Sequence, residues 1–67
     1  MTVRFEYFQS EVDGQWYFQF VSSRGEIIIM SAGYDKMEDC LYAIDLIKFY
    51  ADVAPIIQPD VDLEAFT

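Results

Sequence analysis

The stretch from Gly25 to Tyr34 limits most strongly what this chain can fold into. Its centre is a run of four apolar residues, which predicts a strand over residues 26–31 that is hydrophobic on both faces. Gly33 and Tyr34 then form a corner, after which the spacing of apolar residues becomes helical. The run itself consists of Ile27, Ile28, Ile29 and Met30. No set of residues in this stretch could activate water, hold a metal or cradle a phosphate, so it predicts a fold and no chemistry.

The length of 67 residues supports one domain, and a domain of this size buries only about 60% of the surface of its unfolded chain. Against this, 54% of the residues are apolar and 18% are aromatic, which is a large share for a small core. We therefore expect part of the apolar surface to be buried against a second subunit. The single domain is expected to span residues 1–67, with an acidic C-terminal segment at residues 52–67 that also carries apolar residues.

The charge of the chain excludes two classes of partner. Twelve acidic and four basic residues give a net charge of −8, and the bases are scattered at Arg4, Arg24, Lys36 and Lys48. Nucleic acids and anionic membranes bind clustered basic residues, so neither is expected as a partner. The single cysteine, Cys40, cannot form an internal disulfide, and no apolar run approaches the roughly 20 residues that cross a bilayer. We expect a soluble, cytoplasmic protein.

Two segments before the apolar run are predicted to form a β-hairpin. Residues 3–9 alternate between apolar and charged side chains through most of their length, as a half-buried strand does. Residues 15–21 alternate in the same way, with three aromatic side chains on one face. The dipeptide Asp13-Gly14 between them is a turn signal. The three segments together predict an antiparallel meander of three strands.

The third strand of this meander lies at an edge, where its two apolar faces invite pairing with another chain unless something covers them. The turn that leads into it, at residues 22–25, is predicted to be of type I′. In such a turn Arg24 would take a positive φ, which asparagine tolerates better.

Residues 36–51 have helical periodicity. Asp35 is expected to cap the N-terminus of this helix, and Glu38 follows three residues later in a capping-box arrangement. One apolar stripe is predicted to pack on the sheet. Its members are Met37, Cys40, Ala43, Ile44, Ile47 and Ala51.

A second apolar stripe, Tyr42, Leu46 and Phe49, points away from the first and needs a cover of its own. Among the acids that follow the helix stand Ile56 and Ile57, and then Val61, Leu63 and Phe66. This apolar content is too high for a plain disordered tail. We expect residues 53–58 to be ordered, and some of the tail to contact the second stripe in the same chain or in a partner chain.

Four groups of residues have side chains that could carry chemistry. Cys40 has no histidine in the chain to activate it, so a buried apolar role fits it better. Glu38, Asp39 and Asp45 lack partner residues for a metal or acid–base site, and a solvent-exposed helix face is the interpretation that fits them better. Most of the aromatic residues suit a sheet core, and Tyr34 is expected to close the end of that core. We therefore predict no catalytic, cofactor-binding or metal-binding residues.

In order and spacing, a set of short motifs over residues 5–50 resembles the YegP-like family of small bacterial domains of unknown function. The motifs are Phe5-Glu6-Tyr7-Phe8, Gly14-Gln15-Trp16, Gly25-Glu26-Ile27-Ile28, Ser31-Ala32-Gly33-Tyr34, Cys40, Ile44 and Ile47-Lys48. The resemblance implies an α+β fold in which three antiparallel strands precede one helix and a short C-terminal strand (β-β-β-α-β). Because the family occurs as tandem repeats or as one unit that dimerises, the resemblance also implies that this single unit forms a homodimer.

The sequence therefore predicts a non-catalytic, homodimeric binding or accessory module without a cofactor, and the identity of any further protein partner stays open. The alternative is a small-molecule site or an enzyme that is completed across the dimer interface. The residues expected at the interface are Ile27, Ile28, Ile29, Met30, Tyr42, Leu46, Phe49, Ile56 and Ile57.

Overall fold

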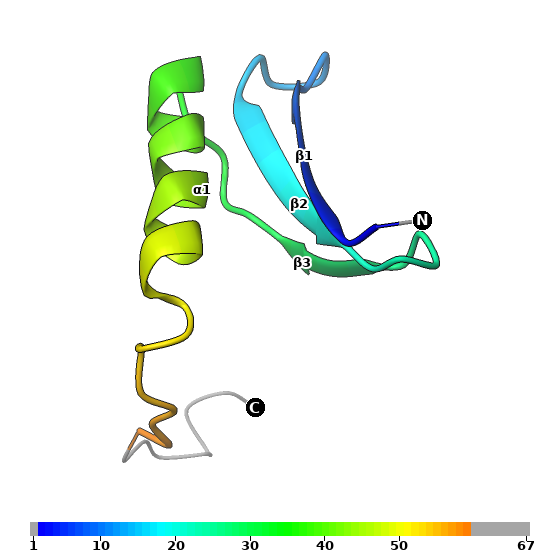
Figure 1. The fold of residues 1–67 in the computed structure, drawn as a ribbon. Coiled ribbons are helices and arrows are strands. Elements are labelled where there is room, and N and C mark those ends of the chain that lie inside the picture. Colours follow the sequence, from blue (N-terminus) through cyan, green and yellow to red (C-terminus); the bar gives the residue numbers. More distant parts are fainter. Residues whose placement is uncertain (1, 60–67) are drawn as a thin grey trace, which may run out of the picture.

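The computed structural model describes residues 2–59 and contains three strands followed by one helix (Figure 1). The elements are β1 (Arg4–Gln9), β2 (Trp16–Val21), β3 (Ile27–Met30) and α1 (Met37–Tyr50). The strands form one antiparallel sheet in the order β1-β2-β3. The α+β fold predicted from the sequence is confirmed, and each observed element is one or two residues shorter than its predicted range.

The hairpin of β1 and β2 places aromatic side chains opposite one another on both faces of the sheet. Phe5 pairs with Phe20 and Tyr7 pairs with Phe18 on the face that α1 covers. The rings of Phe5 and Phe20 lie 4.9 Å apart, which is within the range of favourable aromatic pairs. Cross-strand pairs of this kind set the register of the hairpin.

The turn between β2 and β3 differs from the one predicted. The Gly25 amide donates to the Ser22 carbonyl at 2.9 Å, and Gly25 has a φ of 89°. No other kind of residue between positions 2 and 59 has a positive φ, so Arg24 does not occupy a left-handed position and the type I′ assignment is wrong. Glycine takes the left-handed position because it lacks a Cβ atom, and Arg24 is free of the strain that the sequence predicts.

Strand β3 contains an irregularity that turns its side chains. Ile29 pairs with Phe20 and Ile27 pairs with Val21, so Ile28 is the extra residue of a β-bulge. Beyond Met30 the Ser31 side chain accepts a hydrogen bond from the Phe18 amide at 2.9 Å. The chain then leaves the ladder and returns for a single bridge between Trp16 and Tyr34.

The core lies between the middle of the sheet and one side of α1. Phe18 of β2 is buried together with Cys40 and Ile44 of α1. The partly buried residues packed around these three are Phe5, Trp16, Tyr34, Leu41, Ala43 and Ile47. Tyr34 therefore closes the core as predicted, whereas Met37 and Ala51 at the two ends of the predicted stripe remain exposed. Leu41, outside the predicted stripe, joins the core instead.

The N-terminal cap of α1 is not Asp35. The helix begins at Met37, and Lys36 occupies the cap position without a side-chain hydrogen bond. Asp35 instead accepts a hydrogen bond from Gln15 Nε2 at 3.1 Å. Asp35 lies one residue before the cap position, and its carboxylate instead ties the corner before the helix to the sheet. Glu38 and Asp39 in the first turn still interact favourably with the helix dipole.

The segment after α1 contains no strand as far as residue 59. Its amides at Val53 and Ala54 donate to the Tyr50 carbonyl, and the chain then runs away from the sheet (Figure 1). A strand needs a neighbouring ladder with free hydrogen-bonding groups, and within the described residues none lies beside residues 53–58. The apolar residues Val61, Leu63 and Phe66 lie outside the described residues.

Because the core is small, truncation of the Ile44 side chain should strongly lower the stability of the domain. We expect Ile44→Ala to lower the free energy of unfolding by about 2–4 kcal/mol, because the cavity opens directly on Phe18 and Cys40. Urea denaturation followed by tryptophan fluorescence measures the loss. Val12→Ala is the matched control, because Val12 is 96% exposed in the β1–β2 turn, and it should change stability by less than about 0.5 kcal/mol. Equal effects of the two substitutions would contradict the assigned core.

Candidate interaction surfaces

Strand β3 presents an uncovered apolar surface. All four of its side chains are between 47% and 58% exposed. The bulge and the alternation of the strand distribute them over both faces of the sheet, so α1 on one face cannot cover them all. The surface formed by Ile27, Ile28, Ile29 and Met30 is called the β3 edge below.

The two edges of the sheet differ in charge. At the β1 edge the Arg4 guanidinium contacts the Glu6 carboxylate at 2.7 Å, and Gln19 donates a hydrogen bond to the same carboxylate. The hydrogen bonds from Gln19 and Arg4 lower the pKa of Glu6. The β3 edge carries no charged residue along its length. Charged side chains on an edge strand discourage pairing with another chain, so β3 is the edge open to a partner.

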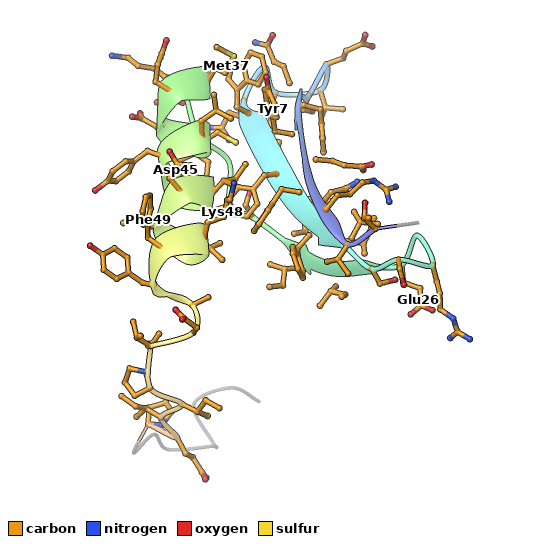
Figure 2. The ribbon with its side chains drawn as sticks, in the orientation of Figure 1. Tyr7, Glu26, Met37, Asp45, Lys48 and Phe49 are labelled. Atoms are coloured by element: carbon orange, nitrogen blue, oxygen red, sulfur yellow. The ribbon has the colours of Figure 1, made fainter. Side chains whose placement is uncertain are left out.

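The outer face of α1 is the second uncovered apolar surface. Tyr42 is 64% exposed and Phe49 is 75% exposed, and Leu46 between them is also exposed. Figure 2 shows Phe49 pointing away from the sheet. These three residues, the outer stripe, lie about one helical turn apart along the same side of the helix.

The described part of the tail does not cover the outer stripe in the same chain. Ile56 is fully exposed and Ile57 is largely exposed, so neither packs on Tyr42, Leu46 or Phe49. Ile56 and Ile57 thus do not supply the cover within one chain, and the expected contact of the tail with the outer stripe, in the same chain or in a partner chain, stays a prediction. The nine predicted interface residues thus form separate surfaces: the β3 edge, the outer stripe and the pair Ile56–Ile57.

A polar network that the sequence did not predict lies at the loop end of the sheet. The Tyr17 hydroxyl donates to Asp13 Oδ2 at 2.5 Å, and the Gln15 amide nitrogen of the backbone donates to Asp13 Oδ1. The hydrogen bond from Tyr17 lowers the pKa of Asp13, and the same bond raises the pKa of Tyr17. In the sequence, only the spacing of four residues between Asp13 and Tyr17 across a turn indicates that the two side chains could meet. The network ties the β1–β2 turn to β2 and offers no unpaired acid or base.

The remaining candidates for chemistry are Cys40 and the side chains that could bind a metal ion. Cys40 is fully buried, and burial raises the pKa of its thiol, which disfavours the reactive thiolate. Among residues 2–59, no three histidine, cysteine, aspartate or glutamate side chains gather where they could hold a metal ion. The same part of the chain encloses no pocket, and its helix is too short to cross a membrane.

The Asp13–Tyr17 hydrogen bond should make part of the stability depend on pH. Because the folded pKa of Asp13 is lowered, its contribution is present above the ordinary value of 3.8 and is lost as the pH falls through the folded value. We expect Tyr17→Phe to destabilise the protein at pH 7, and the difference from the unsubstituted protein to shrink as the pH falls below 3.8 and Asp13 becomes protonated. Thermal denaturation of both proteins across this pH range measures it. A difference that stays constant with pH would mean that the hydroxyl acts without the carboxylate.

Comparisons with known proteins identify the family without a function. The chain matches the model of a domain of unknown function (DUF1508) over residues 12–58. Its fold is similar to that of a protein from Haloferax volcanii solved by NMR in solution, with a TM-score of 0.74, 22% sequence identity, and coverage of 87% of this chain and 97% of that chain. No curated protein is significantly similar to it. The match to more than half of the chain shows that it belongs to the DUF1508 family of YegP-like small domains of unknown function.

Proposed function

We propose that the chain is a non-catalytic binding or accessory module that works as a homodimer, in which the β3 edges of two copies are covered by the partner. The exposed, uncharged and two-faced apolar strand at the edge of the sheet carries this proposal. A second copy removes both the free ladder and the exposed side chains. The arrangement is self-complementary, because antiparallel pairing of two identical strands satisfies a two-fold axis.

Burial of the β3 edge would contribute substantially to a small domain. About half of each of the four side chains is exposed, and burying a whole one contributes about 1.5–3 kcal/mol. Two such edges brought together would therefore gain about 3–6 kcal/mol of hydrophobic free energy per chain, before the entropy cost of ordering the side chains is subtracted. This gain is comparable to the entire stability of many small domains.

The C-terminal segment offers a further part of the interface. It leaves α1 away from its own sheet, with Ile56 and Ile57 exposed and Pro55 before them (Figure 1). Proline suits the start of a strand because it forfeits no hydrogen bond of the ladder there. The segment can thus serve as a short strand that is exchanged onto the partner subunit. This exchange would supply the C-terminal strand that the family resemblance implies.

A charge placed on the β3 edge should separate the two copies. We expect Ile28→Lys to shift the protein from dimer to monomer at micromolar concentration, because the ammonium would have to be buried at the interface. Sedimentation velocity measures the mass. Val12→Lys adds the same charge at an exposed position in the β1–β2 turn and should leave the dimer intact. A monomer of 7.8 kDa for the unsubstituted protein would contradict the proposed assembly.

Truncation after Ala51 tests the part played by the tail. We expect the shortened chain to lose melting temperature and to dimerise more weakly, because Ile56 and Ile57 would no longer be available to the partner. Differential scanning calorimetry and sedimentation at matched concentrations measure the two effects. A shortened chain that keeps both its melting temperature and its dimer would show that the tail contributes nothing to the assembly.

A further inference from the structure

The outer stripe is surrounded by acidic residues. Glu38, Asp39 and Asp45 lie on the flanks of the stripe, and Asp52 follows at its C-terminal end. Side chains three and four positions apart are neighbours on a helix, so Glu38 and Asp45 both border Tyr42. The result is a surface with two aromatic rings and one leucine at its centre and carboxylates at its rim.

Within residues 2–59, none of the four basic residues forms an ion pair with this rim. Arg4 is paired with Glu6 on β1, and Arg24 lies 3.8 Å from Glu26 beside the β2–β3 turn. Lys36 precedes the helix, and Lys48 stands three residues after Asp45 and four before Asp52, with its side chain extending on the side of α1 that faces the sheet (Figure 2). The four carboxylates of the rim outnumber the two lysines of this region, so the surface keeps a net negative charge.

This charge argues against two possible covers. A second copy laid helix against helix would bring two negative rims together, and like charges across an interface are costly. The chain's own C-terminal segment has four acids after Lys48, at Asp52, Asp60, Asp62 and Glu64, and no base. Both covers repel the surface they would occupy. The homodimer described above uses the β3 edge and leaves this face of α1 free.

We propose that the outer stripe docks a lysine- and arginine-rich amphipathic helix of another protein. Apolar residues of the partner at helical spacing would pack on Leu46 and between the rings of Tyr42 and Phe49. Its cations would meet the carboxylates of the rim and the faces of the aromatic rings. A single helix face is small beside a standard interface, so binding is reversible and weakens as salt is added. The inference rests on the proposed role as a binding module and names the class of its partner.

The test uses the full chain and three synthetic helical peptides, with binding followed by ¹⁵N chemical shifts. The first peptide has leucines at i, i+3, i+4 and i+7 and lysines elsewhere; the second keeps the lysines and replaces leucine with serine; the third keeps the leucines and replaces lysine with glutamate. We expect shifts confined to residues 38–53 with the first peptide, at least about five-fold weaker binding of the second, and none of the third.

Two variants and two matched controls locate the surface. Phe49→Ser and the double variant Glu38→Gln/Asp45→Asn should each weaken binding of the first peptide by about five-fold or more, since they remove the apolar centre or the charged rim. Val12→Ser and Glu11→Gln remove an exposed apolar residue and an exposed acid from the β1–β2 turn, and should leave binding unchanged. Sedimentation of each variant shows that the dimer is retained.

Three results would overturn the inference. Shifts spread over the whole acidic surface, with all four variants alike, would mean non-specific attraction of a cationic peptide. Shifts at residues 38–53 that depend on protein concentration without any peptide would assign this face to a second copy. No binding by a protein that sediments as a dimer would reject the basic helix as partner while leaving the homodimer standing.

Discussion

The packing of Phe18 against Cys40 and Ile44 is the contact on which the rest of the structure depends. It joins the central strand to the helix, and it is the only cluster of buried side chains between these two elements in residues 2–59. The aromatic pairs of β1 and β2 extend it across the hairpin, and Tyr34 closes it where the chain turns from sheet to helix. The helix is too narrow to cover a three-stranded sheet, so its position over β2 decides which apolar residues stay outside.

The exposed apolar residues are the consequence of this geometry. With α1 committed to β2, the β3 edge and the outer stripe cannot reach the core of the same chain. They differ in what surrounds them: the β3 edge is uncharged and has free backbone groups, whereas the outer stripe is bordered by carboxylates. The first environment favours an identical strand, and the second favours a cationic partner. One small domain thereby presents two surfaces that need not compete.

Periodicity was sufficient to predict the three strands, the helix and most of the side of the helix that is buried, because these depend on the separation of apolar from polar residues. Local details depend on which of several groups forms a given hydrogen bond, and the sequence alone does not show this. Asp35 fits a cap by its position, yet Gln15, distant in sequence, takes its carboxylate. Gly25 alone can supply the left-handed residue of its turn, which leaves Arg24 unstrained. The Asp13–Tyr17 hydrogen bond depends on the geometry of the loop, which the sequence does not show. The C-terminal strand that the family resemblance implies would need a neighbouring ladder, and residues 2–59 of one chain offer none beside the tail.

The central claim is that the β3 edge of one copy is covered by a second copy. Mixing ¹³C-labelled and unlabelled protein and recording isotope-filtered NOEs tests it most directly, because only contacts between copies are detected. The account predicts intermolecular NOEs from the methyl groups of Ile27, Ile28, Ile29 and Met30. Contacts between copies that involve only other surfaces, or no intermolecular NOE at concentrations where β3 remains folded, would contradict it.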